Sequence, residues 1–181
     1  TMPILGRVPD RWTRSRHDGV QNWPASTTVA ESPANKDVLW VGTDDGNLQV
    51  TRDGGKSWKN VAERITGLPK GTYVSRVIAS AHADGTAYAT FDGHRSNDFG
   101  VYVYATSDFG ETWKKITDGM PNNNGIMNVI REHPKNPDLL FAGGEYGAYV
   151  SFTRGTKWIR LAMNLPTVPV DDILIHPRDN D

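Results

Sequence analysis

Short segments of alternating or continuous apolar residues recur along the chain, and glycine, proline, asparagine or aspartate bounds each of them. This pattern predicts β-strands separated by tight turns. From residue 26 onward the segments fall into groups of four, which is typical of antiparallel sheets with short connections. The expected strands are 26–31, 38–43, 47–51 and 57–61, then 73–80, 86–91, 101–106 and 112–116, then 127–131, 139–143, 148–151 and 158–161, with a further strand at 171–175.

One eight-residue motif lies between the third and fourth expected strands of every group. Its form is a hydroxyl residue, any residue, Asp, any residue, Gly, any residue, a second hydroxyl residue and Trp. The first two copies match fully, whereas the third has Thr153 and Lys157 at the Asp and second hydroxyl positions. A unit that recurs every 45–55 residues predicts stacked repeats. The matching positions are Thr51, Asp53, Gly55, Ser57 and Trp58; Thr106, Asp108, Gly110, Thr112 and Trp113; and Ser151, Gly155 and Trp158.

Each position that recurs among the copies of the motif has a structural role. The short Asp side chain accepts hydrogen bonds from amides of its own turn, and Gly adopts backbone angles closed to other residues. Trp carries a large apolar surface, so we expect Trp58 and Trp113 to be buried between neighbouring units. We therefore interpret Asp53 and Asp108 as structural rather than catalytic.

The motif resembles the Asp-box, also called the BNR repeat, of β-propellers, where it joins the third and fourth strands of a blade. Residues 30–33, 39–46, 88–95 and 164–170 are similar to the sortilin-type propellers and to bacterial proteins described as glycosyl hydrolases with BNR repeats. This resemblance implies an all-β fold: a β-propeller fragment of about three four-stranded antiparallel blades. It also implies a secreted or periplasmic location.

The repeats predict the organisation of the whole chain. Residues 1–25 are expected to be the end of a preceding blade and a linker. Blades are expected at 26–66, 67–118 and 119–163, and the inner strand of a further, incomplete blade at 164–181. Propellers close with ~4–8 blades. We therefore expect either a fragment of a longer propeller or a chain that completes its ring with other copies of itself.

Composition narrows the classes of function. The chain has 181 residues, a formal net charge of −1 and no cysteine. These values argue against a nucleic-acid surface, a polybasic membrane anchor, a disulfide framework and a thiolate metal site. No apolar run approaches the ~20 residues of a membrane span. Neither a phosphate-binding glycine loop nor a metal-ligand spacing appears, so we expect no cofactor and no metal.

Acidic residues follow the second expected strand of every unit. They are Asp44, Asp45, Asp92 and Glu145. Glycoside hydrolysis needs two carboxylates ~5–10 Å apart, which Asp44 or Asp45 and Glu145 could supply across the axis. Aspartate and glutamate in such turns are equally explained by turn chemistry.

The longest of these loops, 92–100, carries His94, Arg95, Asp98 and Phe99 and is the best candidate for a ligand surface. The function we predict is a non-catalytic propeller module that binds a protein, peptide or glycan through loops on one face. The alternative is a glycoside hydrolase of the sialidase or xyloglucanase kind, and a third possibility is a purely structural spacer in a multidomain exported protein. A sialidase would need an arginine cluster and a tyrosine nucleophile, and no spacing marks Arg76, Arg131 and Tyr146 as that set.

Overall fold

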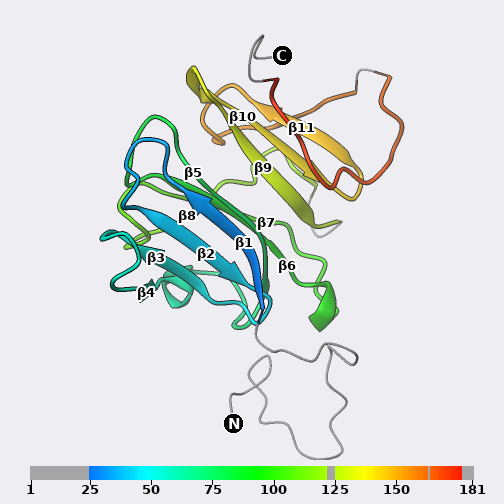
Figure 1. The fold of residues 1–181 in the computed structure, drawn as a ribbon. Helices are drawn as coiled ribbons and strands as arrows, with labels where there is room; N and C mark the ends of the chain where they lie inside the picture. Colours follow the sequence, from blue (N-terminus) through cyan, green and yellow to red (C-terminus); the bar gives the residue numbers. More distant parts are fainter. Residues whose placement is uncertain (1–24, 122–124, 163, 177–181) are drawn as a thin grey trace, which may run out of the picture.

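The structure is a computed structural model that describes residues 25–121, 125–162 and 164–176. It contains three four-stranded antiparallel sheets and two short 3-10 helices, η1 (Ala62–Arg64) and η2 (His94–Ser96) (Figure 1). The expected blade end at residues 1–25 lies, apart from Ala25, outside the described residues. None of the helical turns in the described ranges has the length and apolar character needed to cross a bilayer.

Each sheet is formed by four consecutive strands. The first contains β1 (Ser26–Glu31), β2 (Leu39–Thr43), β3 (Leu48–Thr51) and β4 (Lys59–Asn60). The second contains β5 (Tyr73–Ala79), β6 (Ala87–Asp92), β7 (Tyr102–Thr106) and β8 (Lys114–Lys115). The third contains β9 (Met127–His133), β10 (Asn136–Gly144), β11 (Gly147–Ser151) and β12 (Ile159–Arg160).

The predicted all-β fold with three four-stranded antiparallel sheets is confirmed. The expected strand at 171–175 is not formed, because these residues pair with no other strand among the described residues. An inner strand obtains its ladder hydrogen bonds from the second strand of its own sheet. The described residues include no such second strand after residue 175.

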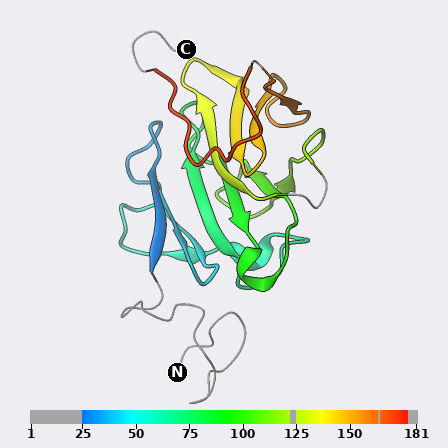
Figure 2. The same ribbon diagram turned by 90° about the vertical axis from the view of Figure 1, so that its right-hand side faces the viewer.

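The second sheet lies between the other two, and one hydrophobic core fills each interface (Figures 1 and 2). Trp40 and Leu48 of the first sheet meet Phe91 and Tyr104 of the second in the first core. In the second core, the opposite face of the second sheet meets Leu140 and Tyr149, among others, of the third. Because strand side chains alternate between faces, the middle sheet supplies both cores.

A repeated hydrogen bond fastens the inner strands to one another. β1, β5 and β9 each contain one residue at which the pairing register with the second strand shifts. The side chain of this residue donates a hydrogen bond to a main-chain carbonyl of the innermost segment of the following unit. The three pairs are Thr27 Oγ1 to Val74 O (2.7 Å), Ser75 Oγ to Met127 O (2.9 Å) and Asn128 Nδ2 to Val170 O (3.4 Å). Residues 170–175 therefore lie beside β9 in the register of a further inner segment, although they form no strand.

The eight-residue motif forms a hydrogen-bonded turn between the third and fourth strands. In the first copy Thr51 Oγ1 donates to Asp53 (2.7 Å) and accepts from the amide of Gly55 (3.0 Å). Asp53 also accepts from the amide (2.9 Å) and the hydroxyl (2.5 Å) of Ser57. The second copy repeats these four bonds around Asp108. In the third, Ser151 Oγ accepts the amide of Gly155 (2.9 Å) and lies 3.3 Å from Thr153 Oγ1, which accepts the amide of Lys157 (3.0 Å).

These hydrogen bonds stabilise the charged form of the motif aspartates. Donation from the Ser57 hydroxyl, its amide and the Thr51 hydroxyl lowers the pKa of Asp53 far below its usual range. The Thr112 hydroxyl is the main cause of the lowered pKa of Asp108. A carboxyl with a lowered folded-state pKa stabilises the fold above its unfolded pKa of about 4, and this contribution is lost as the pH falls through the folded value.

Replacing Asp108 with asparagine is therefore expected to lower the melting temperature at pH 7, and to lower it progressively less as the pH falls below about 4. Thermal unfolding of both proteins over this pH range measures the difference. Asp118→Asn, an exposed carboxyl outside the motif, is the control and should change little. A deficit of the Asp108 variant that persists undiminished in acid would show that the carboxylate charge contributes nothing to the turn.

The motif also joins the second and third sheets to the sheet that precedes each of them. Trp113 meets Trp40 of the first sheet edge to face, with ring centroids 6.0 Å apart. Trp158 is buried, and its indole donates to the carbonyl of Ile116 (2.8 Å). Trp113 is only partly buried and Trp58 is 43% exposed, so the expectation of burial holds in part for Trp113 and is wrong for Trp58. No described sheet precedes the first one, and the Trp58 indole instead donates to Gly55 of its own turn (3.1 Å).

Candidate functional site

The loops that follow the second strands lie at one end of the three sheets. They are residues 44–47 after β2, 93–101 after β6 and 145–146 after β10. Because successive strands are antiparallel, these loops share one face, which we call the loop face, and the motif turns lie at the opposite end, the motif face. The helical turn η2 belongs to the longest loop (Figure 2).

Asp44 and Asp45 are both engaged within the first sheet. Asp44 is 5% exposed and accepts the amide of Ala25 (2.9 Å). Asp45 accepts the Thr43 hydroxyl (2.5 Å) and the side-chain amide of Asn47 (2.8 Å). The Asp45 contacts close the turn locally, as the turn-chemistry interpretation requires, whereas Asp44 binds the backbone that precedes β1.

Asp92 and Glu145 both lie close to the imidazole ring of His94. Nδ1 of His94 lies 3.5 Å from Asp92 Oδ1, and Nε2 of the same ring lies 3.3 Å from Glu145 Oε1. The amide of His94 also donates to Asp92 Oδ1 (2.8 Å). The ring of Phe99 meets the imidazole edge to face at 4.9 Å. Residues of two neighbouring sheets thus form one cluster, whose members were predicted under two separate hypotheses.

Arg95 and Asp98 shape the rest of the loop. The Arg95 guanidinium lies 4.4 Å from the centroid of the Tyr73 ring. Asp98 accepts the amide of Gly100 (2.9 Å) and the hydroxyl of Tyr102 (2.7 Å). Burial, with the Asp98 hydrogen bond as a second cause, raises the pKa of Tyr102 to about 12. Asp98 therefore fastens the loop to β7.

Two aromatic rings on this face remain open to solvent. Phe99 is 46% exposed and Tyr146 is 40% exposed. Tyr146 directly follows Glu145 and packs beside Gly125, whose backbone leaves no room for a larger residue there. The sequence indicated Tyr146 only as a nucleophile candidate, and its exposed place on the loop face was not predicted. Its place next to a predicted acid in the same loop was the available signal.

The two arginines considered for a sialidase do meet. Arg76 of β5 and Arg131 of β9 lie 3.6 Å and 2.7 Å from the same carboxylate oxygen of Asp172. Nε of Arg131 also donates to the carbonyl of Ile173 (2.9 Å). Burial lowers the pKa of Arg131. These contacts hold residues 171–173 against β9. In the described ranges, no three His, Asp or Glu side chains gather as metal ligands.

Comparison with known proteins finds no family model that matches the chain. The chain is 32% identical over 90 residues, 49% of its length, to an oligoxyloglucan-reducing end-specific xyloglucanase of Emericella nidulans. It is 25% identical over 169 residues, 87% of its length, to vacuolar protein sorting/targeting protein 10 of Paracoccidioides brasiliensis. The chain spans 10% of each of these relatives.

Solved structures show the same architecture. An ancestral GH74 enzyme superposes with a TM-score of 0.58 at 21% identity, covering 76% of this chain and 18% of the enzyme. YCF48 bound to D1 peptide gives a TM-score of 0.60 at 16% identity, covering 82% of this chain and 44% of YCF48. Both are β-propellers. The chain therefore has the β-propeller fold, and its three sheets are three four-stranded antiparallel blades.

Proposed function

We propose that the chain is part of a β-propeller that binds a protein, peptide or glycan through its loop face, and that its own residues perform no catalysis there. We further propose that the eight-residue motif is an Asp-box, that the blades span 26–66, 67–118 and 119–163, and that further blades or other copies of the chain complete the ring. Val29 and Ile159, on the first and third sheets, are 66% and 56% exposed, which supports covering by further sheets.

The observation that carries the proposal is the His94 imidazole between Asp92 and Glu145. A glycosidase keeps the space between its two carboxylates for the glycosidic oxygen and, in inverting enzymes, for a water molecule. Here the imidazole fills that space, with one ring nitrogen toward each carboxylate. Asp44 is bonded to the amide of Ala25, and Asp45 is bonded within its own turn. The four acids are therefore better explained as parts of the loops than as a catalytic pair.

The exposed groups suit recognition. Phe99 and Tyr146 offer half-exposed rings in the same two loops that carry Arg95 and Glu145. Aromatic and arginine side chains contribute most of the binding energy in many interfaces, and aromatic rings bury large surfaces with few rotatable bonds. The peptide in the YCF48 structure and the sorting function in the name of the fungal relative support a polypeptide ligand.

Replacing Phe99 with alanine is expected to weaken ligand binding by about tenfold or more, as truncation of an interface anchor does. Peptides selected on the wild-type chain from a phage-displayed random library, and glycans retained on an array, supply the ligands. Affinities for the wild type and Phe99→Ala are then compared by calorimetry.

Phe152→Ala is the matched control, because Phe152 is 62% exposed in the motif turn at the opposite face. Its affinity should equal that of the wild type. Selection of no ligand, or equal losses in the two variants, would contradict recognition by the loop face.

The alternative function is glycoside hydrolysis. It is favoured by the xyloglucanase and GH74 names among the similar proteins and by the approach of Asp92 and Glu145 to one histidine. In that case His94 would have to move away when substrate binds, and the two carboxylates would act as acid and base.

A further inference from the structure

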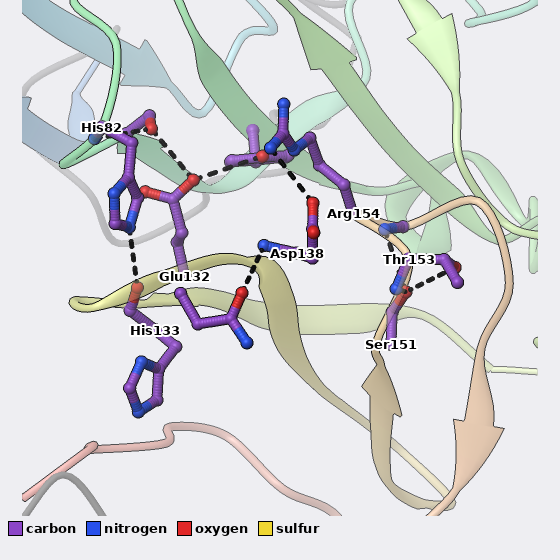
Figure 3. Close-up of polar contacts among 11 residues, drawn as sticks. His82, Glu132, His133, Asp138, Ser151, Thr153 and Arg154 are labelled. Carbon is purple, nitrogen blue, oxygen red and sulfur yellow. Dashed lines mark hydrogen bonds and ion pairs between the residues drawn. The ribbon is translucent and has the colours of Figure 1, made fainter.

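A cleft of about 580 Å³ lies between the second and third sheets at the motif face, and this volume is within the usual range of small-molecule sites. Buried Tyr88 and Ile116 contribute to its inner lining, and Lys114, Arg154 and Thr156 lie exposed in its wall. Figure 3 shows Glu132, His82 and the Arg154–Asp138 pair of this region. The cleft is opposite to the loop face, so it is independent of the function proposed above.

The interface between the first and second sheets can be compared with this cleft position by position, because the same repeat forms both. A smaller cleft of about 220 Å³ lies there, lined by seven residues. The same seven repeat positions occur in the lining of the larger cleft. In order, Val50, Arg52, Ser57, Trp58, Lys59, Phe109 and Glu111 correspond to Ala105, Ser107, Thr112, Trp113, Lys114, Arg154 and Thr156. The two clefts differ through the side chains that these positions carry.

In the first interface an aromatic ring and a carboxylate close the cleft. The ring of Phe109 packs against the first core, and the Arg52 guanidinium lies over it at 3.9 Å. Glu111 pairs with Lys59 (2.5 Å) and with Arg64. Both groups come from the motif turn of the second sheet and reach across to the first.

In the second interface both groups are missing. Arg154 replaces the phenylalanine, with the same left-handed backbone (φ 52° against 59°), but its side chain pairs with Asp138 (3.0 Å) and is exposed. Thr156 replaces the glutamate. Lys114, which corresponds to Lys59, therefore has no acidic partner within 4 Å among the described residues.

The inner wall of the cleft is already fixed by hydrogen bonds. Glu132 accepts the Ser80 hydroxyl (2.9 Å), the Ala81 amide (2.8 Å) and the Tyr88 hydroxyl (3.3 Å). Burial and this carboxylate raise the pKa of Tyr88. Nε2 of His82 donates to the carbonyl of His133 (3.0 Å). Three neutral donors satisfy the oxygens of Glu132, and Lys114 is the cation of the cleft that lacks an acidic partner among the described residues.

We infer that this cleft binds a ligand that carries an aromatic ring and a carboxylate, and that these groups take the places that Phe109 and Glu111 fill in the first interface. The ring contacts the apolar wall around Ile116, and the carboxylate pairs with Lys114. The ligand is either a free aromatic acid or a peptide whose phenylalanine and glutamate are separated by one residue.

The test is an amide NMR titration of the chain with phenylacetate. Resonances of residues 80–86, 105–107 and 154–157 are expected to shift. Phenylacetamide, which lacks the charge, and acetate, which lacks the ring, are expected to bind at least about tenfold more weakly. A short peptide with Phe and Glu separated by one residue, as Phe109 and Glu111 are, that binds more tightly than phenylacetate identifies a polypeptide as the source, and weaker binding identifies a free acid.

Two variants introduce into the second interface the side chains that close the cleft of the first interface. Thr156→Glu supplies an internal partner for Lys114, and Arg154→Phe supplies the ring, so each should weaken phenylacetate binding by about tenfold. Lys56→Glu places a carboxylate at the equivalent position of the first motif and should leave the affinity unchanged. Absence of shifts around the cleft in the wild type, or undiminished affinity in both the Thr156→Glu and the Arg154→Phe variant, would overturn the inference.

Discussion

Replacing Trp158 with alanine is expected to lower the free energy of unfolding by about 3–5 kcal/mol, the usual cost of removing a fully buried aromatic ring. The indole is 2% exposed within the second core and donates a hydrogen bond to the carbonyl of Ile116 across the interface. The variant loses the buried surface of the ring, leaves a cavity and strands a buried acceptor. Denaturant unfolding followed by fluorescence measures the loss.

Trp58→Ala is the matched control for this prediction, since the same motif position is 43% exposed in the first sheet. Its loss should be about 1 kcal/mol or less, as for partly exposed side chains without a cavity. Equal losses at Trp58 and Trp158 would contradict the assignment of the motif tryptophan to the interface with the preceding sheet.

Replacing Gly110 with alanine is expected to cost about 2–4 kcal/mol, because two penalties combine. The backbone has φ +81°, and a Cβ atom would lie 2.9 Å from Cγ2 of Val61 in the preceding sheet. The left-handed backbone alone costs about 1–2 kcal/mol for alanine, and overpacking adds to it. Unfolding in denaturant again gives the difference.

Gly67→Ala separates the two penalties. Gly67 has the same φ of +81°, but the nearest atom to an added Cβ, the hydroxyl oxygen of Tyr104, would be 3.8 Å away. Only the backbone cost of about 1–2 kcal/mol should appear. If the two alanine variants lose the same stability, the close approach of the motif turn to Val61 is not what requires glycine at Gly110.

Strand positions were predictable because alternation and turn residues are local signals. The strand Ser26–Glu31 has the predicted bounds, whereas each fourth strand is only two residues long. Apolar alternation cannot show where pairing with the third strand ends. The burial of Trp58 was mispredicted because burial depends on a neighbouring sheet. The residues of the motif do not show whether such a sheet packs against them.

The candidate site was predictable in its parts but not in its arrangement. Turn position and residue type indicated His94, Phe99 and Glu145. Their meeting depends on the spacing between two adjacent sheets, which no pattern within one repeat encodes. The cleft at the motif face has a signal that comparison of repeats could have found, since Phe109 and Glu111 become Arg154 and Thr156 at equivalent positions.

The most direct test of recognition without catalysis by this chain is the release of reducing ends from xyloglucan. The wild type is compared with Glu145→Gln and Asp92→Asn, which remove the two carboxylates beside His94. We predict no release above the buffer rate by any of the three proteins. Release by the wild type that both substitutions abolish, with melting temperatures unchanged, would contradict the account and establish the loop carboxylates as a catalytic pair.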